Sequence, residues 1–146
     1  MITELRECNW TAMKYIEVET SAHSQMIDIT ERVNRVIPAD IVEGVCLIFS
    51  MHTTAGMMLN ENTDPAVCSD MIGYLERQVP WDDSEFRHLE GNSAAHIKAA
   101  LTGFSLLMPI KDGKLSLGVW QGVYFCEFDG PRTRKVSVSF LYSNTQ

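Results

Sequence analysis

The sequence contains few of the features that mark specialised protein classes. Its cysteines, Cys8, Cys46, Cys68 and Cys126, show no CxxC spacing, and two lie in apolar runs, so we expect reduced, buried thiols. The longest apolar run, residues 44–51, is far shorter than the ~20 residues that a membrane-spanning helix requires. No internal repeat or low-complexity tract is present. These absences favour a globular, cytoplasmic protein without a membrane segment.

Positive charge is also scarce. Twelve Lys and Arg residues face 19 Asp and Glu residues, and the net charge of −7 opposes binding to a phosphate backbone. Nucleic acid is therefore not an expected partner. The first residues are charged from position 4 and do not resemble the apolar stretch of a signal peptide. A length of 146 residues suits a single domain over 1–146.

Helix signals occur at three places. Residues 28–31 have the Asp-x-x-Glu form of a capping box before a short apolar stripe. Asp64-Pro65 places a capping carboxylate before a first-turn proline, and a clear apolar stripe follows. Asn92-Ser93 precedes a third helix predicted over 94–101. A polar loop of ten residues, 81–90, separates the last two helices and is long enough to suggest a function.

Strand patterns dominate the second half of the chain. With a hairpin turn at Asp112-Gly113, they predict an antiparallel meander. We expect an α+β domain with one large mixed or mainly antiparallel sheet that carries helices on one side. The predicted strands are 11–20, 44–51, 104–110, 115–120, 122–128 and 136–142.

Three histidines are candidate metal ligands. His52 follows the most apolar strand directly, His88 lies in the polar loop, and His96 lies one turn into the third helix. Three neutral imidazoles with an open fourth position suit zinc or another transition metal in a catalytic site. The alternative is that each histidine has only a structural role, because their spacing matches no standard ligand motif.

Two carboxylates and one arginine are candidate catalytic groups. Glu61 follows an apolar stretch and suits either a histidine-orienting acceptor or a base. Glu127 lies in an otherwise uncharged strand, so it either points to water or has a cationic partner, for which Arg132 is the candidate.

Other side chains suit an anionic or flat ligand. Asn92 and Ser93 open the third helix, whose free backbone N–H groups form a natural anion site, and Lys98 adds positive charge. Plain helix capping is the alternative. Trp120 and Gln121 interrupt two strands and suit contact with a flat ring, although a β-bulge with a core tryptophan explains the same pattern.

Several motifs in order resemble the YjbQ family of small bacterial and archaeal proteins. They are His-Thr-Thr-Ala, Asn-Glu-Asn-x-Asp-Pro, His-x-Glu-Gly-Asn-Ser-x-x-His-Ile-Lys, Asp-Gly-Lys-Leu-x-Leu-Gly-x-Trp-Gln-Gly and Glu-x-Asp-Gly-Pro-Arg. The resemblance implies an α+β fold, a homotrimer, and a polar pocket with His52, His88, His96 and Glu127. It also implies a weak thiamine-phosphate synthase activity, which joins a pyrimidine diphosphate to a thiazole phosphate. The usual enzyme for that reaction is a (β/α)₈ barrel of about 250 residues, which this chain is too short to form.

The leading hypothesis is thus a small enzyme, assisted by a divalent metal (zinc, another transition metal, or magnesium with a diphosphate), that acts on an anionic or phosphorylated small molecule. In this hypothesis Arg132 neutralises the leaving pyrophosphate and Trp120 faces the pyrimidine. One alternative is a metal-dependent hydrolase with Glu61 or Glu127 as the base. Another is a ligand-binding or scaffold trimer without turnover.

Overall fold

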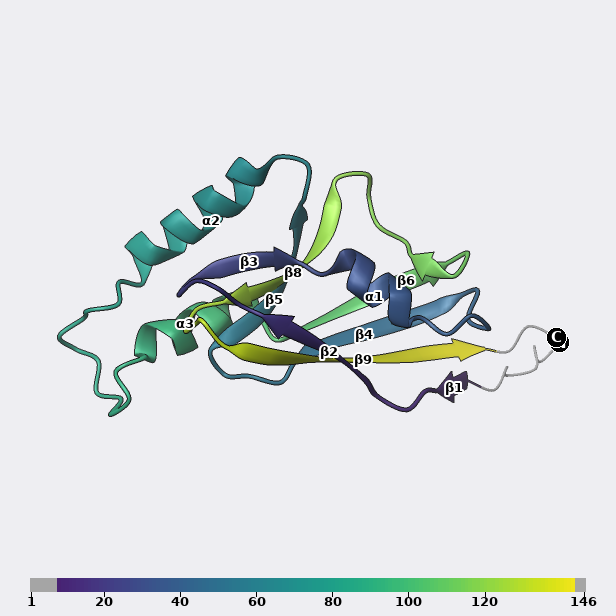
Figure 1. The fold of residues 1–146 in the computed structure, drawn as a ribbon, viewed down its shortest axis with the longest axis horizontal. Helices are drawn as coiled ribbons and strands as arrows, with labels where there is room; N and C mark the ends of the chain where they lie inside the picture. The colour runs from purple at the N-terminus through teal and green to yellow at the C-terminus, as the bar shows by residue number, and fades with distance from the viewer. Residues whose placement is uncertain (1–7, 144–146) are drawn as a thin grey trace, which may run out of the picture.

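Two antiparallel sheets face each other in the computed structural model, which describes residues 8–143 (Figure 1). The large sheet has the order β1-β9-β4-β6-β7, and β2 also pairs with β9. Its strands are β1 (Cys8–Trp10), β2 (Lys14–Glu19), β4 (Gly44–Ser50), β6 (Ser105–Lys111), β7 (Lys114–Leu115) and β9 (Thr133–Ser143). The small sheet has the order β3-β8-β5, with β3 (Gln25–Asp28), β5 (Ala55–Glu61) and β8 (Gln121–Glu127).

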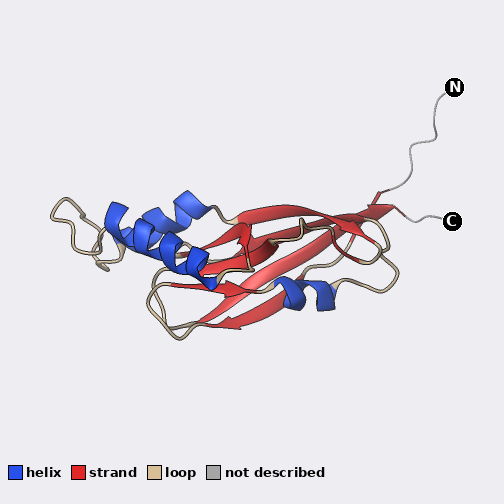
Figure 2. Cartoon of the chain, turned by 90° about the horizontal axis from the view of Figure 1, so that it is seen from above, coloured by secondary structure: helices blue, strands red, loops and turns tan. Residues whose placement is uncertain are grey.

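Three helices complete the described structure: α1 (Thr30–Val36), α2 (Pro65–Gln78) and α3 (Ser93–Thr102). Figure 2 shows α1 apart from the other two helices, which lie together near one end of the sheets. α2 and α3 cover the outer face of the small sheet, where Ala95 and Ala99 pack with Tyr124 and Phe128. A Cβ at Gly56 of β5 would lie 2.6 Å from the carbonyl oxygen of Gly103, so this close approach requires glycine. No helix within residues 8–143 is long and apolar enough to cross a membrane.

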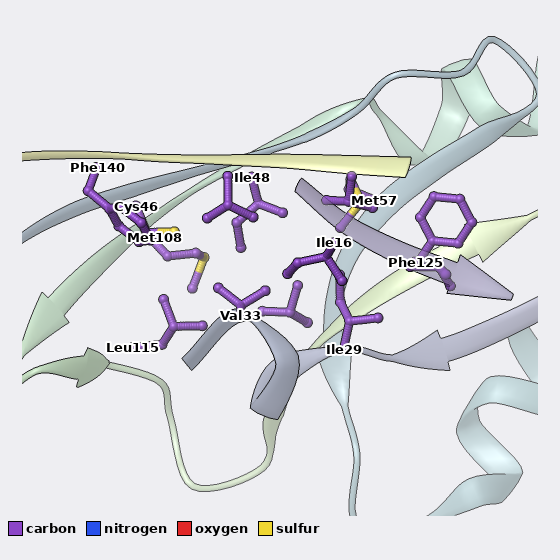
Figure 3. Packing of buried hydrophobic residues seen from close by; sticks show 14 of the residues in the cluster. Ile16, Ile29, Val33, Cys46, Ile48, Met57, Met108, Leu115, Phe125 and Phe140 are labelled. Carbon is purple, nitrogen blue, oxygen red and sulfur yellow. The ribbon is translucent and has the colours of Figure 1, made fainter. Parts of the chain in front are cut away.

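The main core lies between the two sheets (Figure 3). Ile48 and Phe140 point inward from the large sheet, and Met57 and Phe125 point inward from the small sheet. Val33 of α1 is fully buried in the same cluster, so the short helix closes one side of the sandwich. Apolar burial between the layers is the main source of stability for such an arrangement.

The predicted α+β class with antiparallel pairing is confirmed, while the arrangement of the strands differs in detail. The strands divide between two sheets, because β8 is apolar on both of its faces and needs cover on both. Val123 and Phe125 of β8 meet the large sheet, and Tyr124 and Cys126 meet the helices. The predicted meander is wrong, because the chain crosses from β7 to the small sheet and returns to the large sheet with β9.

Most local predictions are confirmed. Asp64 caps α2 by accepting a hydrogen bond from the backbone N–H of Ala66 at 2.8 Å. Asp112 and Gly113 adopt φ values of 52° and 75°, as the hairpin turn between β6 and β7 requires. The strand predicted over 115–120 is wrong beyond Leu115. The next residue, Ser116, lies opposite Pro109 of β6, and proline has no N–H to donate, so the pairing of β7 with β6 ends there.

Candidate functional site

His88 and His96 lie together at the start of α3. Their ring centroids are 5.1 Å apart and the rings are inclined by 78°. They border an open hollow of about 490 Å³ on the surface, which we call the histidine hollow. It is lined by Glu85, Phe86, Arg87, His88, Ser93, His96 and Ile97. The sequence motifs predicted both histidines and Ser93 for a site, whereas Arg87 and Phe86 were missed because an aperiodic loop has no pattern that indicates which side chains turn inward.

A hydrogen-bonded chain links the start of α3 to the turn between β8 and β9. Asn92 is buried, and its Nδ2 donates to Asp129 Oδ2 at 3.1 Å. Arg132 donates to the same oxygen from Nη2 at 2.8 Å and to the Asp129 carbonyl from Nε at 2.7 Å. The position of Asn92 predicted that its side chain would cap α3, but the side chain makes no such hydrogen bond. Arg132 is held in place while 54% of its side chain stays exposed.

His52 occupies a different part of the surface. Its Nε2 accepts a hydrogen bond from the backbone N–H of Lys135 at 2.8 Å. Burial, followed by the positive charge of Arg134, holds the pKa of His52 below its ordinary value of 6.5, so the ring is neutral at neutral pH. His52 borders a second hollow, of about 350 Å³, which we call the phenylalanine hollow. It is lined by Phe49, Ser50, Met51, His52, Thr53 and Phe104.

The expected meeting of three histidines does not occur within one chain. Among the described residues, no three His, Cys, Asp or Glu side chains are arranged to hold a metal ion together. The nearest approach to such a site is the His88–His96 pair, with Glu90 Oε2 at 4.0 Å from His88 Nε2. The three predicted histidines therefore do not form a metal site within a single subunit, and only His88 and His96 lie close together.

Glu127 is fully buried and its partner is Arg134, which the sequence interpretation overlooked in favour of Arg132. Arg134 donates from Nε to Oε2 at 2.7 Å and from Nη2 to Oε1 at 2.5 Å. Thr20 Oγ1 and the backbone N–H groups of Phe128 and Asp129 also donate to the carboxylate. Both oxygens are thus occupied, and Glu127 faces the protein interior instead of a ligand.

Strand alternation agrees with the pairing of Glu127 with Arg134, but Arg132 has the same parity, so alternation alone does not choose between the two arginines. Arg134 lies on the same parity of β9 as the core residues Val136 and Val138, and Glu127 shares its parity with Phe125 in β8. Two opposite charges on inward faces must pair, because a lone buried charge is costly.

Lys98 does not reach the histidine hollow, although it was predicted to bind substrate. It lies on the face of α3 that packs inward, together with Ala94, Ala95 and Ala99, and is fully buried. Its Nζ is 2.7 Å from Glu76 Oε2 of α2, an ion pair without a well-angled hydrogen bond among the described residues. The pair joins α2 to α3.

Glu61, Trp120 and Gln121 lie at the far end of the small sheet. Glu61 pairs in register with Gln121, whereas Ala55 at the other end of β5 pairs with Glu127. Six residue steps along β8 place Gln121 about 20 Å from Glu127. Trp120 is 64% exposed, so it is not a core tryptophan. Within one chain these three residues are separate from the histidine hollow.

Comparisons with known proteins give one consistent result. The family model described as "UPF0047 protein YjbQ-like" matches residues 14–143. The UPF0047 protein YugU of Bacillus subtilis is 43% identical over 88% of this chain and 98% of its own length. The UPF0047 protein MJ1081 of Methanocaldococcus jannaschii is also 43% identical, over 86% of this chain and 91% of its own length.

Solved structures agree with these sequence relatives. A YjbQ/UPF0047-family protein from Clostridium acetobutylicum superimposes with a TM-score of 0.84 at 45% identity, over 87% of this chain and 98% of its own. A protein of unknown function from Sulfolobus solfataricus reaches a TM-score of 0.87 at 29% identity, over 94% of this chain and 100% of its own.

Proposed function

Because the chain belongs to the UPF0047 family of YjbQ-like proteins, we propose that it is a small enzyme acting on a phosphorylated or otherwise anionic small molecule at the histidine hollow. The observation that carries the proposal is the His88–His96 ring pair at 5.1 Å beside that hollow. Two imidazoles, a serine hydroxyl and an arginine that border one hollow are groups suited to binding oxygen anions.

The surroundings of the hollow add to this support. Ser93 begins α3, whose N-terminus has no side-chain cap, so the first N–H groups favour negative charge. Arg87 lines the hollow. Arg132 is hydrogen-bonded to Asp129, which in turn accepts a hydrogen bond from Asn92, the residue before Ser93. A chain with a net charge of −7 gathers several cationic or donor groups near this hollow.

The candidate reaction is thiamine-phosphate synthesis, which the family resemblance implies. In this reaction the thiazole nitrogen bonds to the methylene carbon of the pyrimidine, while the carbon–oxygen bond to the diphosphate breaks and pyrophosphate leaves with the electron pair. A divalent ion held by His88, His96 and substrate oxygens would supply neutralising charge. Arg87 and Arg132 would bind and orient the departing diphosphate.

Thiamine-phosphate formation by the purified, zinc- or magnesium-supplied protein tests the proposal. We expect product from the two precursors, and a loss of about 10²- to 10³-fold in turnover for His96→Ala or His88→Ala, the usual cost of removing one electrostatic contact to the transition state. His23→Ala is the matched control, because His23 packs against Trp81, outside the residues that line the hollow, and its loss should leave turnover unchanged.

Other results would identify a different function. No product above the level of the His88→Ala, His96→Ala double variant would contradict the synthase. Release of phosphate or amine from a panel of esters and amides, abolished by a chelator, would identify a metal-dependent hydrolase. Metal binding that raises the melting temperature without any turnover would identify a ligand-binding or scaffold protein.

We also propose that the protein is a homotrimer that assembles through the outer face of the large sheet. The register places Trp10, Leu141, Val45 and Pro109 in one row across this face, and Leu47 and Leu107 in the next. Leu107 is 68% exposed and Trp10 is 56% exposed. An apolar sheet face of this extent is typical of an interface between subunits. A neighbouring subunit would also be needed to bring Trp120 and Gln121 near a histidine hollow.

Light scattering tests the trimer directly. The wild-type protein should have three times the chain mass of 16.5 kDa, and Leu107→Glu should shift it towards the single-chain mass, because a charge would be buried at the interface. Leu101→Glu is the matched control, since Leu101 is equally exposed, at 65%, but lies on α3. A wild-type monomer would contradict the proposal.

A cytoplasmic location completes the proposal. All four cysteines are free thiols, but only Cys46 and Cys126 are buried as expected, since Cys68 is half-buried and Cys8 is exposed. Burial raises the pKa of both Cys46 and Cys126 to about 12. Buried thiols without disulfide partners support a reducing compartment.

A further inference from the structure

We propose that residues 82–91 form a flap that closes over the histidine hollow when an anion binds, and that Glu85 opposes this closure by holding Arg87. The flap joins α2 to α3 (Figure 1). These helices cover the small sheet, on the side away from the outer face of the large sheet where the proposed subunit interface lies. The proposal rests on the proposed function, since the flap has a use only if the hollow binds an anion.

The flap has little hold on the rest of the molecule. Every one of its residues is exposed except Phe86, which is half-buried. Among residues 8–143, its hydrogen bonds stay within the flap, apart from one that Asn92 Nδ2 donates to Glu90 Oε2 at 3.5 Å. A segment with little burial and few outside hydrogen bonds moves at a low cost in free energy. The flap can therefore change position without disturbing the core.

Both ends of the flap are fixed. At one end Trp81 packs against the cluster beneath the helices and meets the His23 ring edge-on, with the centroids 4.4 Å apart. At the other end the buried Asn92 donates to Asp129 at 3.1 Å. Gly91, beside this second anchor, has a φ of 71°, in the left-handed region that favours glycine. A mobile segment between two fixed ends is the usual construction of a lid.

The flap supplies one wall of the histidine hollow. Glu85, Phe86, Arg87 and His88 line it from the flap, and Ser93, His96 and Ile97 line it from α3. The two walls meet where the rings of His88 and His96 lie 5.1 Å apart. An anion in the hollow would contact both walls, so its binding would favour the position in which the flap lies closest to α3.

Arg87 has partners that an anion can replace. Its Nη1 donates to the carbonyl oxygens of Ser84 at 2.6 Å and Phe86 at 3.3 Å, and its Nη2 lies 3.9 Å from Glu85 Oε2. All of these partners belong to the flap itself. A phosphate group offers paired, charge-assisted hydrogen bonds, which are stronger than bonds to neutral carbonyls. Anion binding would therefore turn the Arg87 guanidinium from the backbone of the flap towards the hollow.

Glu85 competes with the anion for Arg87. It lines the hollow and carries the carboxylate that lies beside the guanidinium. An incoming anion must displace this carboxylate and then remain near its negative charge. A phosphate with one charge gains little from the exchange, whereas a diphosphate brings more charge and more acceptor oxygens. The Glu85–Arg87 contact thus makes the flap selective for diphosphates over singly charged anions.

Limited digestion with chymotrypsin tests whether the flap closes. Leu89 is fully exposed and does not line the hollow, so an anion protects the bond after Leu89 only by moving the flap. We expect inorganic pyrophosphate, at ten times its Kd, to slow this cleavage about ten-fold, because only the open form is cut. His96→Ala is the matched control. It should be cut at the wild-type rate, which shows that it is folded, and pyrophosphate should not protect it.

Calorimetry with pyrophosphate tests the role of Glu85. Glu85→Gln should tighten binding about two- to five-fold, the usual worth of one exposed ion pair. Asp82→Asn is the matched control, since it removes one negative charge from the flap at a residue that neither lines the hollow nor pairs with Arg87. Equal tightening in both variants would overturn the role of Glu85, because the change in net charge would then explain it.

The outcomes separate the flap from the anion site. Pyrophosphate that binds without slowing cleavage after Leu89 would overturn the flap alone and leave the proposed function to its turnover assay. Protection that persists in His96→Ala would also overturn it, since closure would not depend on the hollow. Pyrophosphate that fails to bind the wild type would overturn the flap and contradict the anion site together.

Discussion

Replacing Glu127 with glutamine should lower the free energy of unfolding by about 3–5 kcal/mol, because it leaves the buried Arg134 without its counter-charge. The carboxylate accepts five hydrogen bonds, two of them from Arg134. The amide group of glutamine would turn a donor towards these donors. The melting temperature should fall by roughly 10 °C for a chain of this size, which calorimetry measures.

Arg132→Ala is the matched control for Glu127→Gln. Arg132 pairs with Asp129 and is two residues from Arg134 in the sequence, yet more than half of its side chain is exposed. Its loss should cost less than about 1 kcal/mol. Equal effects of the two substitutions would show that burial of the Glu127–Arg134 pair does not matter.

The same pair predicts how stability depends on pH. Burial alone would raise the pKa of Glu127, but the hydrogen bonds from Arg134 and Asp129 outweigh it and hold this pKa below its ordinary value of 4.5. A lowered folded-state pKa contributes stability above about pH 4.5 that is lost as the pH falls through the folded-state value. Urea unfolding between pH 7 and pH 3 should therefore show a steeper loss for the wild type than for Glu127→Gln.

Replacing Glu76 with glutamine should destabilise the protein by about 2–3 kcal/mol, because Lys98 is fully buried and loses the anion with which it pairs. The figure lies below the range for fully buried pairs, since the Glu76 side chain is 36% exposed and water reaches it. Hydrogen exchange should show the loss first in α2, which has no buried residue of its own.

Lys98→Met is expected to behave differently from Glu76→Gln. It fills the same space with an apolar side chain and leaves Glu76 partly hydrated, so stability should stay within about 1 kcal/mol of the wild type. Turnover and substrate affinity should also be unchanged, because Lys98 faces α2 and not the histidine hollow. A stable Lys98→Met protein with weakened substrate binding would restore Lys98 to the substrate-binding role that its sequence position predicts.

Local chemistry determined much of the fold from the sequence alone. The Asp64 cap, the Asp112–Gly113 turn and the apolar stripe of α2 each depend on residues within one or two turns of chain. Such signals need no distant partner, which is why they could be interpreted correctly. The ordered motifs likewise placed His88, Ser93 and His96 near one another, since all three belong to one loop and the helix that follows it.

Long-range pairing was decided only by the tertiary structure. Which arginine meets Glu127 depends on how β8 and β9 are positioned across the two sheets, and Arg132 and Arg134 are too close in sequence for spacing to choose between them. The burial of Lys98 depends on α2, and the separation of His52 from His88 and His96 depends on where β4 ends. The sequence thus determined most of the elements, the Asp64 cap and the candidate residues. The packing of two sheets and two helices decided which of those residues share a site, because side chains meet through space and not along the chain.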